Sequence, residues 1–111
     1  MKKTMMFLLT ILCVPIVSFG AQIYGNLRSN NASVGANVPV TIRCEDGSLN
    51  NGTTDSSGSY SVPARPSKKC WMSVYFGGRW SKESSVYPYD DPVRYDFDVV
   101  DNGGTIELRR R

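Results

Sequence analysis

Residues 53–60 read TTDSSGSY and lie between two stretches in which apolar and polar side chains alternate. Asp55 can accept hydrogen bonds from the backbone N–H groups of the turn that it opens. Gly58 permits a positive φ, which residues with a β-carbon resist. Tyr60 follows two residues later, on the apolar side of the next stretch. The segment therefore predicts a structural turn made by Asp55, Gly58 and Tyr60 between two β-strands.

Alternation with a period of two residues continues on both sides of this turn. It covers six short stretches separated by Gly, Asn, Asp, Ser and Pro: residues 22–28, 38–45, 59–63, 70–76, 93–99 and 105–109. The pattern is typical of antiparallel strands that bury one face and expose the other. Strands of this length and spacing predict an all-β fold, an antiparallel Ig-like β-sandwich of about seven strands.

Turn dipeptides mark the expected connections between these strands: Asp46-Gly47, Asn51-Gly52, Gly77-Gly78 and Asn102-Gly103. They favour turns because Gly and Asn tolerate a positive φ. The first two predict one long connection between the second and third strands. The sequence does not distinguish between an edge strand and a loop over residues 84–92, because Pro88 and Pro92 are compatible with both.

The N-terminal segment has a different character. Two lysines precede an apolar run over residues 5–17, which is too short for a bilayer span of about 20 residues. Ser18 and Gly20 then supply small residues before a cleavage point. This layout predicts a secretory signal peptide over residues 1–20 and a single domain over residues 21–111, without a transmembrane segment. The alternative is an N-terminal membrane anchor.

The expected location follows from this leader, because a short Lys-Lys start is typical of bacteria. We expect a secreted or periplasmic protein. Of the 13 Lys and Arg residues, two lie in the leader, so 11 remain against 10 Asp and Glu residues. The basic residues are scattered apart from Arg109, Arg110 and Arg111, which we expect to form a solvated end. The sequence therefore predicts no nucleic-acid partner.

Cys44 and Cys70 are the cysteines that follow the leader. An even count in an exported chain predicts one disulfide bond. Both residues fall in the apolar rows of their strands, so their sulfur atoms can meet in one core. Closure of this loop is worth roughly 3–4 kcal/mol in the chain-entropy model. A redox-active pair is the alternative, but such pairs usually lie close in sequence.

Three segments resemble the motifs of carboxypeptidase regulatory-like domains. They are I-x-G-x-L at Ile23, Gly25 and Leu27; P-V-x-I at Pro39, Val40 and Ile42; and the D-x-x-G-x-Y turn at Asp55, Gly58 and Tyr60. Such domains are transthyretin-like β-sandwiches and are also similar to Cna protein B-type repeats. The resemblance covers most of residues 22–108 and implies a transthyretin-like sandwich. It implies no single function, because one fold carries many.

The chain lacks residues that several kinds of catalytic site require. Cna-type domains with an internal isopeptide bond need a lysine in an early core strand, and residues 22–28 contain none. The chain has no histidine, which excludes a Ser-His-Asp triad, a Cys-His pair and a His-ligated zinc site. It also departs from the transthyretin-like hydroxyisourate hydrolases, which use histidines.

The close acidic pairs Asp90-Asp91 and Asp96/Asp98 keep a carboxylate-only hydrolase as a third hypothesis. A calcium site at Asp90 and Asp91 is the other use of these carboxylates, although their spacing matches no known calcium loop. We therefore expect a protein that is not an enzyme and has no cofactor and no metal site.

Aromatic residues are the candidates for a binding surface: Trp71, Tyr75, Trp80, Tyr87 and Tyr89. Alternation places Trp71 and Tyr75 on the strand face that points away from Cys70 and Met72. Trp80, Tyr87 and Tyr89 lie in or near the loop-rich stretch that follows. Exposed aromatic rings anchor protein interfaces or stack on sugar rings, and the simpler alternative is that they only cover a strand face.

The sequence thus predicts a non-enzymatic module that binds another envelope or extracellular protein, or has a structural role there. Binding of a polysaccharide through the aromatic rings is the alternative. An exposed flat aromatic strip would favour the sugar, and an apolar patch or an open edge strand would favour the protein.

Overall fold

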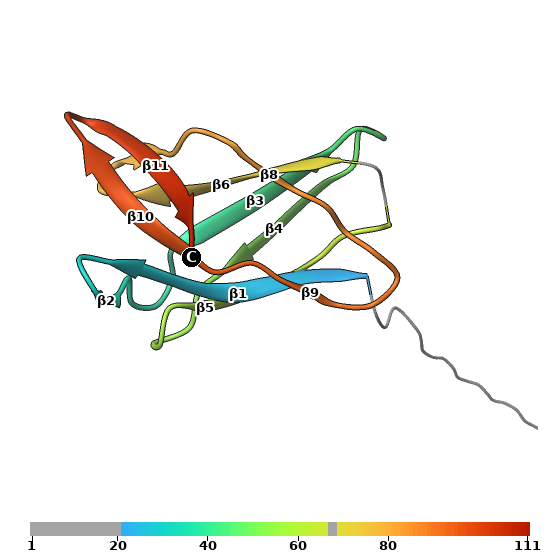
Figure 1. The fold of residues 1–111 in the computed structure, drawn as a ribbon, viewed down its shortest axis with the longest axis horizontal. Helices are drawn as coiled ribbons and strands as arrows, with labels where there is room; N and C mark the ends of the chain where they lie inside the picture. Colours follow the sequence, from blue (N-terminus) through green and yellow to red (C-terminus); the bar gives the residue numbers. More distant parts are fainter. Residues whose placement is uncertain (1–20, 67–68) are drawn as a thin grey trace, which may run out of the picture.

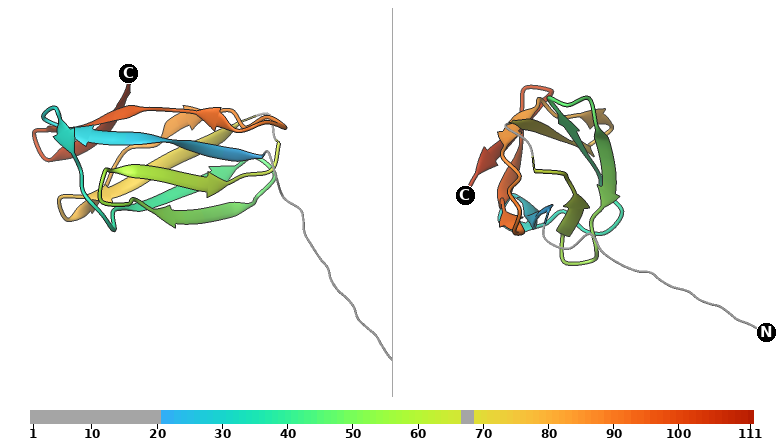
Figure 2. Two further views of the ribbon diagram at one scale, coloured as in Figure 1. Left: turned by 90° about the horizontal axis from the view of Figure 1, so that it is seen from below. Right: turned by 90° about the vertical axis from the view of Figure 1, so that its right-hand side faces the viewer.

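Two packed β-sheets form the described part of the chain (Figures 1 and 2). The structure is a computed structural model that describes residues 21–66 and 69–111, so the predicted signal peptide lies outside the described residues. Every regular element within the described residues is a strand. The expected all-β architecture with two packed layers is confirmed.

One sheet has six strands and is built around β1. It contains β1 (Gln22–Ser29), β2 (Ala32–Ser33), β5 (Ser59–Pro63), β9 (Val93–Arg94), β10 (Phe97–Asn102) and β11 (Thr105–Arg110). On one side β1 pairs with β5 and β2, and on the other side with β9 and β10. β11 completes the sheet as the antiparallel partner of β10.

The other sheet has five strands, all antiparallel to their neighbours. It contains β3 (Pro39–Cys44), β4 (Leu49–Thr53), β6 (Cys70–Phe76), β7 (Arg79–Trp80) and β8 (Ser84–Val86). The order is β4-β3-β6, and both β7 and β8 pair with the far side of β6. β4 is therefore one edge of this sheet.

β1 runs parallel to β9 and β10, which corrects the expectation of purely antiparallel pairing. Ile23 lies beside Val93 and Leu27 beside Phe97. The reason is that residues 87–92 carry the chain from β8 in the other sheet to the end where β1 begins (Figure 1). No hairpin joins these strands, so nothing forces them to be antiparallel.

β4 occupies the connection predicted between the second and third sequence-based strands. The prediction of a turn at Asn51-Gly52 is wrong, because both residues lie in β4 and pair with Thr41 and Val40. Gly52 suits this position because β4 passes close to β5 there. A Cβ atom on Gly52 would lie 3.0 Å from Val62 Cγ2.

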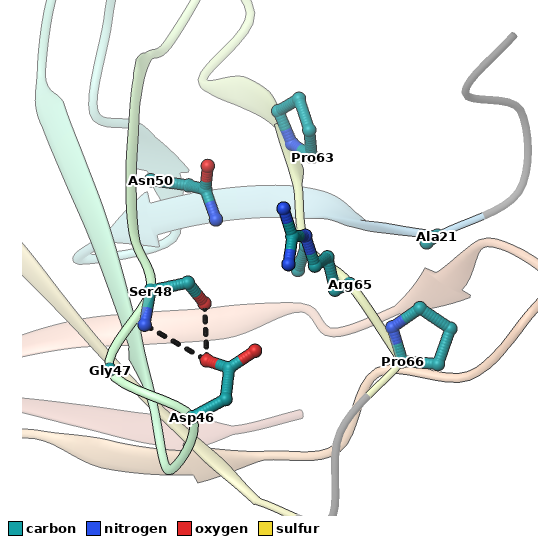
Figure 3. A pocket seen from close by; sticks show the side chains of 9 residues that line it. Ala21, Asp46, Gly47, Ser48, Asn50, Pro63, Arg65 and Pro66 are labelled. Atoms are coloured by element: carbon teal, nitrogen blue, oxygen red, sulfur yellow. Dashed lines mark hydrogen bonds between the residues drawn. The ribbon is translucent and has the colours of Figure 1, made fainter.

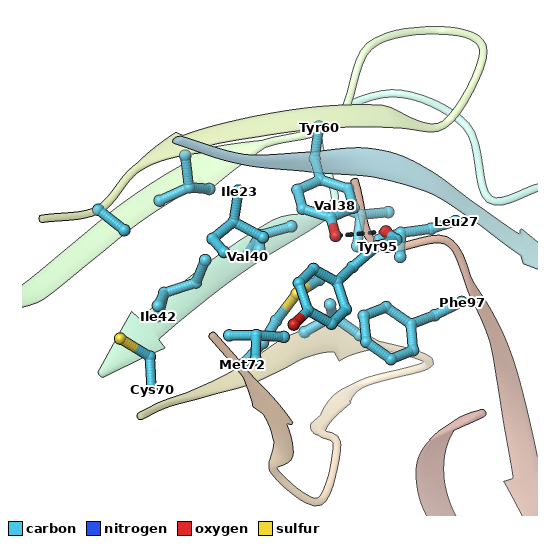
Figure 4. Packing of buried hydrophobic residues seen from close by; sticks show 14 of the residues in the cluster. Ile23, Leu27, Val38, Val40, Ile42, Tyr60, Cys70, Met72, Tyr95 and Phe97 are labelled. Atoms are coloured by element: carbon cyan, nitrogen blue, oxygen red, sulfur yellow. Dashed lines mark hydrogen bonds between the residues drawn. The ribbon is translucent and has the colours of Figure 1, made fainter. Parts of the chain in front are cut away.

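A kink divides the single strand expected over residues 93–99 into β9 and β10. At the kink the Tyr95 carbonyl oxygen lies against Gly25 of β1, where any Cβ atom would overlap it. The Tyr60 hydroxyl donates a hydrogen bond of 2.6 Å to the same oxygen (Figure 4). Gly25 and Tyr60, which belong to different motifs, therefore meet at one backbone atom.

The segment 53–60 crosses from β4 in one sheet to β5 in the other. The Asp55 carboxylate accepts hydrogen bonds from the N–H groups of Ser57 (2.9 Å) and Ser59 (3.0 Å). Gly58 has a φ of 80°, and a Cβ atom there would lie 2.6 Å from the Leu27 carbonyl oxygen. The turn thus needs a carboxylate for its N–H groups and a glycine against β1.

The core lies between the two sheets and is filled from both (Figure 4). The largest fully buried side chains are Phe97, Ile23, Leu27, Ile42, Met72 and Ile106. Cys44 and Cys70 face each other across β3 and β6 and form the expected disulfide bond. Both are buried, so the bond ties two neighbouring strands from inside the core.

The C-terminal arginines are exposed, as expected, and two of them also contact the rest of the domain. The Arg110 guanidinium lies 4.0 Å from the centroid of the Tyr95 ring. Arg111 pairs with Asp98 at 3.0 Å and donates a hydrogen bond of 3.1 Å to the Asn26 carbonyl. β11 extends to Arg110, which places these side chains over the kink and over β1.

Candidate functional site

Large exposed side chains gather on the outer side of the five-stranded sheet. Residues directly opposite each other in an antiparallel pair share one face of the sheet. Arg43 lies opposite both Leu49 and Trp71, and Tyr75 lies opposite Trp80. The residues that alternate with them on β3 and β6 are buried, so these five point to solvent. We call Leu49, Arg43, Trp71, Tyr75 and Trp80 the aromatic face.

Tyr75 and Trp80 form one end of the aromatic face. Their ring centroids are 5.4 Å apart, and the ring planes are inclined by 68°, an edge-to-face contact. Tyr75 is 40% exposed and Trp80 is 51% exposed. The pair keeps its rings ordered at low entropic cost while leaving much apolar surface in water, which suits an anchor for a partner.

Trp71 forms the other end and carries two cations on its ring. The Arg43 guanidinium lies 4.5 Å from the ring centroid and the Lys69 ammonium 5.5 Å from it. Arg43 donates hydrogen bonds from Nε (3.2 Å) and Nη2 (2.9 Å) to the Glu83 carboxylate, which holds the guanidinium in place. This ion pair raises the pKa of Arg43, mainly through the hydrogen bonds from its guanidinium to Glu83.

Tyr87 and Tyr89 lie apart from the aromatic face, in the connection between β8 and β9. They are 39% and 64% exposed. The Tyr87 N–H donates a hydrogen bond of 3.0 Å to the Tyr95 hydroxyl, which holds this connection against the core. The structure therefore places three of the five predicted aromatic residues on one face and two on the crossover.

Leu49, Arg43 and Glu83 were missed by the analysis of the sequence. Leu49 is 59% exposed, but it lies in the segment that the sequence predicted to be a loop. Alternation in residues 38–45 does place Arg43 outward. The cysteine pair could have predicted that Arg43 lies beside Trp71. If Cys44 pairs with Cys70 on antiparallel strands, Arg43 falls opposite Trp71.

The outer side of the six-stranded sheet is polar by comparison. Gln22, Tyr24 and Asn26 of β1 lie opposite Pro63, Ser61 and Ser59 of β5. Arg94 lies over the Tyr24 ring and pairs with Asp96 at 2.9 Å. The two outer surfaces of the sandwich thus differ in chemistry, and the aromatic face is the one that resembles an interface.

Of the two acidic pairs considered for catalysis, Asp90 and Asp91 lie exposed between β8 and β9, and Asp96 and Asp98 are engaged with other groups. Asp96 accepts hydrogen bonds from Arg94 and from the Asn26 N–H. Burial alone would raise the pKa of Asp96, but these hydrogen bonds outweigh it and the pKa is lowered. Asp98 pairs with Arg111. Over the described ranges, no group of three or more His, Cys, Asp and Glu side chains is arranged to hold a metal ion.

The chain matches no protein-family model, no curated protein and no solved structure. In residues 21–66 and 69–111, no helix is long and apolar enough to cross a membrane. The buried disulfide is typical of proteins that fold in an oxidising compartment.

Proposed function

We propose that this chain is a secreted or periplasmic, non-enzymatic module that binds another protein of the cell envelope or the exterior through its aromatic face. The observation that carries the proposal is that Leu49, Tyr75 and Trp80, each at least 40% exposed, all lie on one side of one sheet. Interface cores are enriched in Tyr, Trp and Arg, and exposed apolar patches mark contact sites.

The anatomy of the aromatic face supports a protein partner over a polysaccharide. Sugar rings stack on flat, open aromatic rings. The ring planes of Tyr75 and Trp80 are inclined by 68°, and Arg43 and Lys69 lie over the ring of Trp71. A partner surface can bury such an uneven patch, with Leu49 at one corner and Arg43 between Leu49 and Trp71.

A transthyretin-like sandwich is the fold family that we propose. Among strands longer than two residues, one layer has the order β5-β1-β10-β11 and the other the order β4-β3-β6-β8. An immunoglobulin constant domain instead places its first, second, fifth and fourth strands in one sheet. The meeting of Gly25 and Tyr60 at the Tyr95 carbonyl gives the shared motifs one structural role.

Affinity capture from an envelope extract tests the function. The protein as the cell exports it is the bait, beside a Tyr75→Ala/Trp80→Ala variant. Tyr24→Ala, on the polar outer side of the six-stranded sheet, is the matched control. We expect a protein that the wild type and the control both capture and that the double variant loses, because anchors of this kind each contribute about 2 kcal/mol or more.

Two results would contradict the proposal. One is equal capture by the wild type and the double variant with both correctly folded. The other is capture of envelope polysaccharide, and of no protein, by the wild type. Melting curves of all three baits provide the check on folding.

A further inference from the structure

β4 has a free backbone edge. Cys44 N–H donates to the Ser48 carbonyl (3.0 Å) and Thr54 N–H donates to the Val38 carbonyl (3.1 Å) at the two ends of the β3–β4 pair. Hydrogen-bonded pairs alternate along an antiparallel ladder, so the even-numbered residues of β4 face β3. The odd-numbered ones turn their N–H and C=O groups away from it. No strand in the described chain pairs with β4 on that side.

A cleft of about 620 Å³ opens beside the first half of β4 (Figure 3). One wall is the β3–β4 connection with Asn50. The other is Ala21 and the segment from Pro63, the last residue of β5, to Pro66. Pro63 and Pro66 have no N–H group, so this wall cannot form a continuous ladder with β4. The two sheets come together at Gly52 and part before it, which leaves the cleft open.

The other long edges, β11 and β5, are protected against added strands, and β4 is not. β5 ends in Pro63, which has no N–H group. β11 carries Glu107, Arg109 and Arg110, and charged side chains discourage strand addition. On the far side of β6, β8 and β7 have three and two residues. β4 reads LNNGT and contains no charge and no proline. It is the edge on which an added strand meets least opposition.

The polar groups of the cleft indicate the charge of its occupant. Figure 3 shows the Arg65 guanidinium directed into the cleft between Asn50 and Asp46. The ion pairs of the described residues do not include Arg65. The Asp46 carboxylate already accepts hydrogen bonds from the Ser48 N–H (2.9 Å) and hydroxyl (2.6 Å). The charge of Arg65 contributes to the lowered pKa of Asp46, but the hydrogen bonds from Ser48 lower it more. An acidic side chain beside β4 would therefore find a guanidinium that no described carboxylate holds in a direct ion pair.

We infer that the free edge of β4 and the adjoining cleft bind an extended, acidic segment of another protein, which adds as a strand to the five-stranded sheet. The backbone of the segment pairs with Leu49 and Asn51, beside the open half of β4, and an acidic side chain reaches Arg65. A second copy fits less well, because five residues span only about 17 Å and a stable interface buries about 800 Å² per partner. This site adjoins the aromatic face at Leu49, whose backbone it uses, but it does not involve Trp71, Tyr75 or Trp80.

Selection of random heptapeptides displayed on phage, with the purified full-length protein as bait, tests the inference. We expect enrichment of peptides in which β-branched residues alternate and at least one Asp or Glu is present. Binding of the best synthetic peptide is then measured by calorimetry. Asn51→Pro removes one outward N–H group and none that bonds β3, so it should weaken binding about tenfold. Tyr24→Ala, on the outer side of the six-stranded sheet, is the control and should leave the affinity unchanged. Trp80→Ala tests whether the peptide binds to the aromatic face instead.

Two further arms keep the test independent of how Asn51→Pro folds. Arg65→Glu should weaken binding of the acidic peptide and favour a version in which Lys replaces its acidic residue. Two N-methylated versions of the peptide are compared, one methylated at the odd-numbered amides and one at the even-numbered amides. Only one of these two sets of N–H groups faces β4, so methylation of that set should abolish binding and methylation of the other should not.

Each of three results would overturn the inference. They are the absence of any enriched peptide, affinity that is insensitive to N-methylation in both registers, and a dimer in sedimentation that Asn51→Pro dissociates. The last would identify the occupant as a second copy of this chain. Loss of binding in Trp80→Ala alone would move the site to the aromatic face.

Discussion

At Gly25 the backbone of β1 touches the kink between β9 and β10, and the Tyr60 hydroxyl donates to the same Tyr95 carbonyl. Burial raises the pKa of the Tyr60 hydroxyl well above its usual range, so this donor keeps its proton at every ordinary pH. The parallel pairing of β1 with β10 begins directly after this contact. The absence of a side chain at residue 25 thus permits β1 to pair with both β9 and β10, on either side of the kink.

Gly25→Ala should destabilise the fold by about 2–4 kcal/mol, because the new methyl group forces the Tyr95 carbonyl away from β1. Urea denaturation followed by tryptophan fluorescence measures the loss. Ser61→Ala on the exposed side of β5 is the control and should change the unfolding free energy by less than about 0.5 kcal/mol. Equal unfolding free energies of Gly25→Ala and the control would show that the contact between Gly25 and the Tyr95 carbonyl has room for a methyl group.

Asp55 makes the turn of residues 53–60 sensitive to acid. Hydrogen bonds from the Ser57 hydroxyl and from the Ser59 and Ser57 N–H groups lower the pKa of Asp55. The unfolded chain therefore binds a proton more readily, and the unfolding free energy falls as the pH drops below about 4. Above that pH the contribution of Asp55 is fully present.

Asp55→Asn removes this titration, so its stability should fall less steeply than that of the wild type between about pH 5 and pH 2. Denaturation at several pH values in that range is the measurement. Ser61→Ala, on the exposed side of β5, removes no titrating group and is the control, which should keep the slope of the wild type. Parallel profiles of unfolding free energy against pH for Asp55→Asn and the wild type would rule out Asp55 as a cause of the acid sensitivity.

Among the elements, β3 and β6 are joined by their ladder and also by the Cys44–Cys70 bond. A Cys44→Ala/Cys70→Ala variant should lose roughly 3 kcal/mol of unfolding free energy but keep its strand content, because the bond links strands that are already neighbours. Thermal melting and far-ultraviolet circular dichroism check both parts. A variant that melts like the wild type would contradict the first part, and loss of strand signal at low temperature the second.

The strands themselves could largely be predicted, because a buried face and a wet face impose alternation on the sequence. Cys44 and Cys70 occupied apolar rows, which gave their pairing. The neighbours of β1 could not be predicted, since alternation says which way a side chain points and not which strand lies beside it. β4 was missed because LNNGT has no apolar row: it is an edge strand whose inward positions are Asn50 and Gly52. The places of Arg110 and Arg111 depended on the kink, which no local pattern shows.

Considered as a whole, the molecule presents two outer surfaces of different chemistry on one rigid core. The six-stranded sheet exposes Ser, Gln and Asn side chains beside an Arg94–Asp96 pair. The five-stranded sheet exposes Leu49, Tyr75 and Trp80. If the protein works by binding another protein, the partner should lie on the second surface and not on the first.

Photo-crosslinking in intact cells tests this central claim most directly. Benzoyl-phenylalanine replaces either Ser73, between Trp71 and Tyr75 on the aromatic face, or Ser61, on the outer side of the other sheet. The account predicts a protein adduct of defined mass from position 73 and none from position 61. An adduct from position 61 alone, equal adducts from both, or none from either would contradict it.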